Sequence, residues 1–174
     1  MLEGGEMRRI CLGKRLVLLL LLAGIVHAAP PVADVHLHWK WNQKEMTTPE
    51  QAVATLRAEG VALGVVTGTP PELALELEAL APEIIVPIYG VYRAPGEWST
   101  WHRDPGLLRR VREALATGRY RGIGEIHMIG GFISDWKNPV ISGLFRLAAE
   151  FKVPVLVHTE FSRADYTLGS CPAF

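Results

Sequence analysis

The sequence lacks the features that tie a chain to a membrane, a nucleic acid or a disulfide framework. It has two cysteines in 174 residues, neither with the spacing of a metal site. Eighteen basic residues balance 18 acidic ones, so no excess charge draws the chain to a phosphate backbone or an anionic membrane. The longest apolar run, residues 16–26, is too short to span a bilayer, which takes about 20 helical residues. No glycine-rich phosphate loop follows the first predicted strand, which argues against a dinucleotide-binding sheet.

The apolar run at residues 16–26 has the length of the hydrophobic part of an export signal. Four basic side chains between positions 8 and 15 precede it. Small or apolar residues occupy the −3 and −1 positions of a cleavage site after Ala28. We therefore expect residues 1–28 to be a signal peptide, and the mature protein to be periplasmic or secreted with no stable membrane anchor.

The rest of the sequence alternates short apolar strands with amphipathic helices. Two Thr-Pro-containing capping signatures, at Thr48 and Thr69, and leucines at helical spacing mark helix starts. Strands are predicted over residues 32–37, 61–66, 84–89, 120–126 and 153–157, with a helix after each of the first four. This pattern is typical of an α/β fold with a parallel sheet covered by helices, either an open doubly wound sheet or a TIM-type (β/α) barrel.

Long loops follow three of the predicted strands, whereas the loops that precede strands are short. This asymmetry places an active face at the carboxyl ends of the strands. All five tryptophans fall in the long loops. We expect Trp39, Trp98 and Trp101 to line the mouth of a pocket for a small-molecule substrate, with a purely structural lid as the alternative.

Histidine and glutamate side chains gather at three predicted strand ends. His36 and His38 end the first strand, where alternate residues share a face, so both can bind one divalent ion or simply be half-buried histidines. Glu125 ends the fourth strand and His158 the fifth. Because the carboxyl ends of parallel strands converge, we predict that these four residues bind a divalent metal, zinc first and manganese, iron or nickel as alternatives. His127 is predicted to contact substrate or support the ligands, with a packed histidine as the alternative.

These strand ends resemble the motifs of the amidohydrolase superfamily of metal-dependent hydrolases. In that family a distorted TIM barrel has His-x-His on strand one, a bridging Lys, Glu or Cys on strand four and a His on strand five. The matching residues here are His36 and His38, Glu125, and His158. Gly-Ile-Gly-Glu-Ile and Val-Pro-Val-Leu-Val-His resemble the TatD-type deoxyribonuclease and amidohydrolase-related branches. Tyr-Gly-Val-Tyr-Arg stands where TatD proteins have Gly-x-His-Pro.

The resemblance implies a TIM-type barrel of the metal-dependent hydrolase type over residues 32–160, truncated after about the fifth strand, with an irregular tail over 161–174. The family's general-base Asp would lie beyond Phe174. The implied function is an incomplete hydrolase in which metal-activated water attacks an amide, ester or similar bond. The exposed strand edge predicts self-association. A catalytically inactive half-barrel that acts as a binding or scaffold protein is the alternative, and a TatD-like phosphodiesterase, disfavoured by the neutral charge, is a further one.

Overall fold

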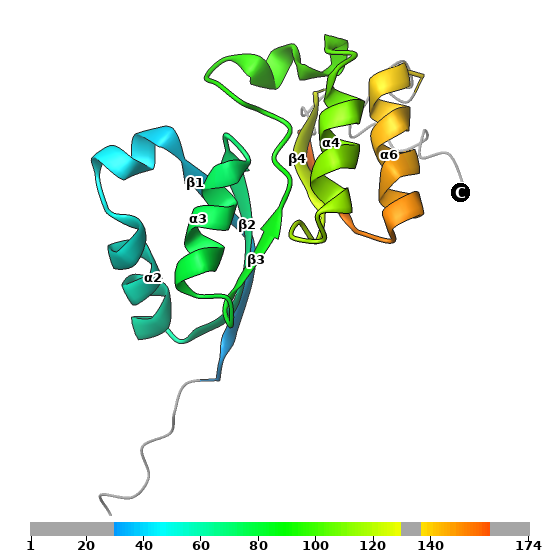
Figure 1. Cartoon of the computed structure of the whole chain (residues 1–174). Helices are drawn as coiled ribbons and strands as arrows, with labels where there is room; N and C mark the ends of the chain where they lie inside the picture. Colours follow the sequence, from blue (N-terminus) through cyan, green and yellow to red (C-terminus); the bar gives the residue numbers. More distant parts are fainter. Residues whose placement is uncertain (1–29, 130–136, 161–174) are drawn as a thin grey trace, which may run out of the picture. The chain divides into compact units, whose positions relative to one another are not determined.

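The computed structural model describes residues 30–129 and 137–160 (Figure 1). The predicted signal peptide, Trp136 and the predicted tail at 161–174 lie outside the described residues. The elements belong to the compact unit Pro31–Phe174. In chain order the strands and α-helices are β1 (Val32–Lys40), α2 (Pro49–Ala58), β2 (Val61–Thr69), α3 (Glu72–Leu80), β3 (Ile85–Ile88), α4 (Leu107–Ala116), β4 (Ile123–Ile129), α6 (Pro139–Phe151) and β5 (Val155–Glu160). Short 3-10 turns are η1 (Trp41–Glu45), η2 (Glu97–Ser99) and η3 (Trp101–Arg103).

Local signals explain where the helices begin. The Thr48 hydroxyl accepts the backbone N–H of Gln51 at 3.2 Å, and the Gln51 side chain accepts the backbone N–H of Thr48 at 3.0 Å, which is a complete capping box. The Asn138 side chain accepts two backbone N–H groups in the first turn of α6. The predicted cap at Thr69 is wrong, because Thr69 ends β2 and α3 begins after Pro71 with no side-chain cap.

The strands run parallel in two small sheets, β1-β2-β3 and β4-β5. An isolated bridge joins Tyr89, just beyond β3, to Ile123 at the start of β4. The Tyr89 N–H donates to the Gly122 carbonyl, and its carbonyl accepts the N–H of Gly124, both at 2.9 Å. These contacts bring β4 beside β3. The parallel strands and their helices agree with the predicted α/β class.

The predicted TIM-type barrel is wrong. Within residues 30–129 and 137–160, β1 pairs only with β2 and β5 only with β4, so the strands do not close on themselves. A barrel of this type needs about eight strands, each hydrogen-bonded on both sides. Alternating strands and helices require only that helices cover a parallel sheet, and the two small sheets meet that requirement.

Two hydrophobic clusters hold the helices on the strands. In the first, Val53 of α2 and Leu77 of α3 pack with Val66 of β2, all of them buried. In the second, α4 and α6 lie side by side against β4, with Val111 and Leu144 fully buried (Figure 1). No helix in the part of the chain that the structure describes is both long and apolar enough to cross a membrane.

Candidate metal centre

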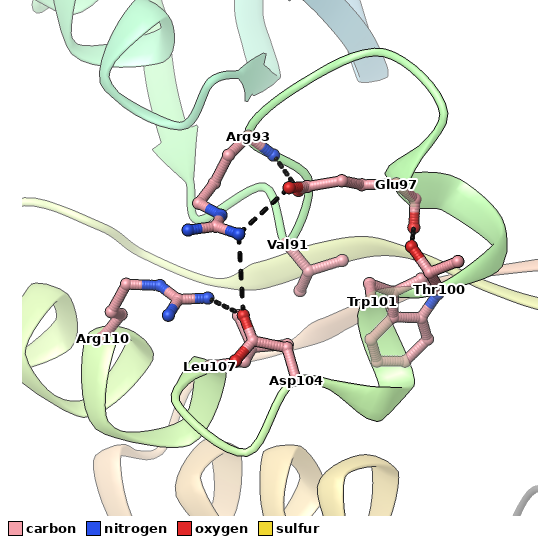
Figure 2. A pocket seen from close by; sticks show the side chains of 8 residues that line it. All are labelled: Val91, Arg93, Glu97, Thr100, Trp101, Asp104, Leu107 and Arg110. Atoms are coloured by element: carbon pink, nitrogen blue, oxygen red, sulfur yellow. Dashed lines mark hydrogen bonds and ion pairs between the residues drawn. The ribbon is translucent and has the colours of Figure 1, made fainter.

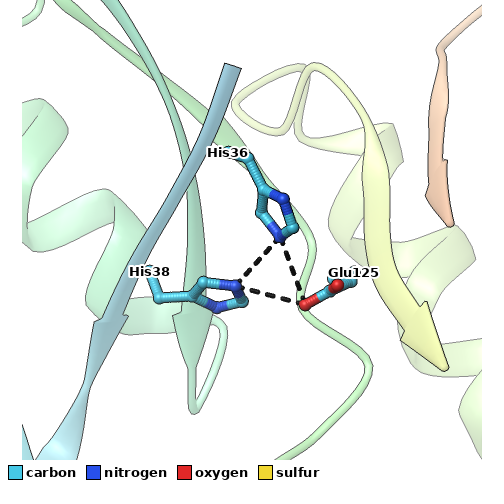
Figure 3. Close-up of side chains that lie close together, drawn as sticks. All are labelled: His36, His38 and Glu125. Atoms are coloured by element: carbon cyan, nitrogen blue, oxygen red, sulfur yellow. Dashed lines mark hydrogen bonds and ion pairs between the residues drawn. The ribbon is translucent and has the colours of Figure 1, made fainter. Parts of the chain in front are cut away.

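Three potential ligand atoms from β1 and β4 lie within 3.3 Å of one another (Figure 3). Nε2 of His36 and Nε2 of His38 are 3.1 Å apart, and Oε2 of Glu125 is 3.3 Å and 3.2 Å from them, respectively. A tetrahedral zinc ion with nitrogen and oxygen ligands separates neighbouring ligand atoms by about 3.3 Å. The triangle therefore has the size of three corners of such a site.

Counting protons shows why a cation suits this triangle. Each neutral imidazole carries one proton, so at most two protons lie among the three ligand atoms. The three pairs of neighbouring ligand atoms therefore cannot all be hydrogen-bonded. In at least one pair, two lone pairs or two N–H groups face and repel each other. A cation would accept a lone pair from all three atoms and remove that repulsion. His36, His38 and Glu125 could therefore hold a metal ion.

A β-bulge in β1 presents the two histidines. Asp34 pairs with Gly64 and Leu37 with Val66, so β1 has one residue more than β2 over this stretch. The Asp34 carboxylate accepts the backbone N–H of His36 at 3.0 Å. Strict alternation would place Asp34 on the ligand face. Instead its carboxylate accepts a hydrogen bond from the His36 N–H, which the bulge removes from the regular pattern of hydrogen bonds between strands.

Glu125 is buried in β4 between two sets of histidines, with only 3% of its surface exposed. Its Oε1 lies 2.6 Å from Nδ1 of His158, while Oε2 faces the histidines of β1. The preceding Gly124 has φ +129°, and a β-carbon there would lie 2.4 Å from the Leu156 carbonyl oxygen. Glycine at this position therefore lets β4 lie close to β5. This close approach fixes the backbone position from which the Glu125 side chain extends.

The electrostatics of the site favour a carboxylate at Glu125 and a neutral imidazole at His38. Burial works to raise the pKa of Glu125, but hydrogen bonds from His158 and His36 hold that pKa below its usual value. Burial lowers the pKa of His38, and nearby Lys40 adds to this effect. Both shifts favour the protonation states that bind metals. His38 Nδ1 is buried and has no partner within the described ranges.

A second group consists of Glu125, His127 and His158, whose potential ligand atoms lie within 4.8 Å of one another. The rings of His127 and His158 stack with centroids 4.3 Å apart and planes at 18°. Because Glu125 belongs to both groups, the five side chains form one His/Glu cluster: His36, His38, Glu125, His127 and His158. The structure thus brings together all four predicted ligands and His127, and their role as ligands remains a prediction.

Tyr92 contacts this cluster and was not anticipated from the sequence. It lies between β3 and η2, and its hydroxyl oxygen is 2.5 Å from Nδ1 of His127. The same oxygen accepts the backbone N–H of His127 at 2.8 Å. Burial raises the pKa of Tyr92 above its usual range, so the phenol is neutral. One sequence feature could have identified Tyr92. It follows a predicted strand, and the segments that follow strands carry the functional side chains in parallel folds.

The three predicted substrate-binding tryptophans lie in different settings. Trp39 is buried in the first hydrophobic cluster, and its Nε1 donates to Oε2 of Glu76 at 3.1 Å. Trp101 is buried in the second hydrophobic cluster. Trp98 is half exposed. The first two therefore have packing roles in the structure, and contact with a substrate remains a prediction for all three.

Trp101 also lines a pocket of about 290 Å³ beside the segment that follows β3 (Figure 2). Oδ2 of Asp104 accepts a hydrogen bond from Nη2 of Arg110 at 2.5 Å and lies 3.8 Å from Nη2 of Arg93. Arg93 also pairs with Oε1 of Glu97 at 3.0 Å. Two guanidinium groups thus meet two carboxylates, and no residue of the His/Glu cluster lines this pocket.

Comparisons with known proteins add no evidence about this site. No protein-family profile matches the chain, and no curated protein sequence matches it. Among solved structures, the chain matches the C-terminal domain of a hydrogenase from Pyrococcus furiosus at 15% identity, covering 78% of this chain and 100% of that domain with a TM-score of 0.24. A likeness at that TM-score says nothing about fold or function.

Proposed function

We propose that this chain is a metal-dependent hydrolase of the amidohydrolase-related type, with the His/Glu cluster as its metal centre. The observation that carries the proposal is the division of the Glu125 carboxylate. Its Oε2 faces His36 and His38, and its Oε1 faces His158. A carboxylate whose two oxygens face separate sets of imidazoles is suited to bridge two cations.

Each residue of the cluster has a distinct part in this proposal. His36, His38 and Oε2 of Glu125 would hold one ion. Oε1 of Glu125 and His158 would hold a second ion in place of the 2.6 Å hydrogen bond that now joins Nδ1 of His158 to Oε1. When bound, divalent ions supply Lewis acidity and lower the pKa of water to about 7. Three protein ligands leave a fourth position open, as catalytic zinc sites do. The mixture of imidazole and carboxylate favours zinc, with manganese, iron or nickel as alternatives.

The proposed substrates are small molecules with an amide, ester or similar bond. The buried Glu125 would supply negative charge that offsets part of the charge of the ions, and imidazole nitrogens would supply the remaining lone pairs. The balance of 18 basic and 18 acidic residues gives no support to a polyanionic substrate.

The test compares metal content and turnover in the same preparations. The full chain is stripped with a chelator, reloaded with zinc or manganese, and assayed on a panel of activated esters and amides. We expect metal-dependent turnover that is lost in His36→Ala/His38→Ala and kept in His102→Ala, a histidine outside the cluster. Metal binding without turnover would favour the binding or scaffold alternative. Equal metal content in the double variant and the parent would contradict the proposed centre.

A further inference from the structure

Tyr92 makes two hydrogen bonds to one residue, His127, and together they determine where protons lie. The backbone N–H of His127 brings its own proton to the Tyr92 oxygen, so the phenol accepts in that bond. The phenol proton then needs a separate acceptor. Tyr92 is 8% exposed, and in the part of the chain that the structure describes its hydroxyl has only His127 as a partner.

The acceptor for that proton is Nδ1 of His127, 2.5 Å away. The opposite assignment, in which Nδ1–H donates to the phenol, would leave a buried hydroxyl proton with no acceptor, which costs free energy. Nδ1 of His127 therefore carries a lone pair. A neutral imidazole has one N–H, so its proton lies on Nε2.

We propose that Tyr92 is a positioning residue that makes His127 a hydrogen-bond donor instead of a metal ligand. The inference rests on the proposed metal centre and narrows it. Coordination through Nδ1 would require breaking the bond from Tyr92, and coordination through Nε2 would require removing its proton. Of the second group, Glu125 and His158 remain as ligands.

The geometry around His127 supports this role. Its ring is stacked on His158 with planes at 18°, which fixes the plane in which Nε2–H can donate. Tyr92 packs against the ring with centroids 5.5 Å apart.

The tautomer can be measured without metal or activity. Long-range ¹H–¹⁵N correlation spectra of the ¹⁵N-labelled, metal-free full chain distinguish the two neutral forms, with His127→Gln used to assign the signal. We expect the Nε2–H form in the parent, a mixture of forms in Tyr92→Phe, and an unchanged signal in Tyr120→Phe, a buried tyrosine whose ring packs edge-on against Tyr89. The Nδ1–H form in the parent would overturn the proposal, whether or not Tyr92→Phe folds.

Zinc titration tests the second half of the inference. His127→Ala should change zinc affinity by less than about 10-fold, the lower end of what an outer-shell partner contributes, whereas His158→Ala should lose more than about 100-fold at the second site. Loss of an ion in His127→Ala would overturn the assignment. A chain that binds no zinc would contradict the metal centre, whereas the wrong tautomer would contradict the role of Tyr92, so the two failures are distinguishable.

Discussion

The pocket beside η3 and the His/Glu cluster both gather ionisable side chains, and they differ in how those side chains are satisfied. In the pocket, Asp104 and Glu97 each meet a guanidinium group, so every carboxylate has a fixed positive partner (Figure 2). In the cluster, three ligand atoms lie at 3.1–3.3 Å from one another with at most two protons to share among them (Figure 3). Carboxylates that are already paired with guanidinium groups indicate a structural role. Ligand atoms that converge without enough protons to form hydrogen bonds between all of them indicate a site for a cation.

The largest expected effect comes from removing the charge of Glu125. Glu125→Gln takes away the carboxylate that both groups share, so we expect zinc affinity to fall by more than about 100-fold, beyond the loss of an outer-shell partner. Glu97→Gln removes a carboxylate from the pocket and should leave zinc affinity unchanged. Isothermal titration of both variants measures the difference, and equal losses would abolish the distinction between the two regions.

Removing only the histidines of β1 should separate the two halves of the cluster. In His36→Ala/His38→Ala we expect the zinc content to fall from two ions to one per chain, because Glu125 and His158 remain. Metal analysis after gel filtration gives the ratio. A double variant that keeps both ions, or that loses both, would show that the two groups do not each bind one ion independently.

The backbone before Glu125 offers a test of how its position is maintained. Gly124→Ala adds a β-carbon that would meet the Leu156 carbonyl and imposes strain at φ +129°, so unfolding free energy should fall by about 2–3 kcal/mol. Gly118 also has a positive φ, +70°, which lies in the less strained left-handed helical region, and a β-carbon there would meet no atom within 4 Å, so Gly118→Ala should cost only about 1 kcal/mol. Urea denaturation compares them. Equal costs would mean that steric contact with β5 does not set the place of Glu125.

The smallest effect is expected in the pocket. Asp104→Asn weakens partly exposed ion pairs to Arg110 and Arg93, and such pairs contribute less than about 1 kcal/mol. Zinc affinity should not change. Thermal denaturation with and without zinc checks both statements, and a loss of zinc-induced stabilisation would connect the pocket to the cluster.

Local patterns in the sequence predict much of this structure. Apolar strands and capped helices identify the α/β class, and the capping box at Thr48 is present as predicted. The prediction that His36, His38, Glu125 and His158 come together follows from one property of parallel sheets, the convergence of their strand ends. His127 joins them because β4 continues to Ile129, beyond the predicted strand end.

Other features depend on contacts that no local pattern reveals. Whether strands close into a barrel depends on pairing between residues far apart in sequence, and the barrel expectation failed for that reason. The bulge in β1 is a single extra residue, visible only once β1 is paired with β2. The bond from Tyr92 to His127 joins residues 35 positions apart. Trp39 shows a further limit, since a tryptophan next to His38 could line a pocket or pack in the core, and only the helices covering the sheet decide between them.

Anomalous diffraction from zinc-loaded crystals of the full chain tests the central claim most directly. The account predicts one peak in contact with Nε2 of His36, Nε2 of His38 and Oε2 of Glu125, and a second beside Oε1 of Glu125 and His158, with His127 outside both coordination spheres. Zinc bound elsewhere, with Glu125 in contact with no ion, would contradict it.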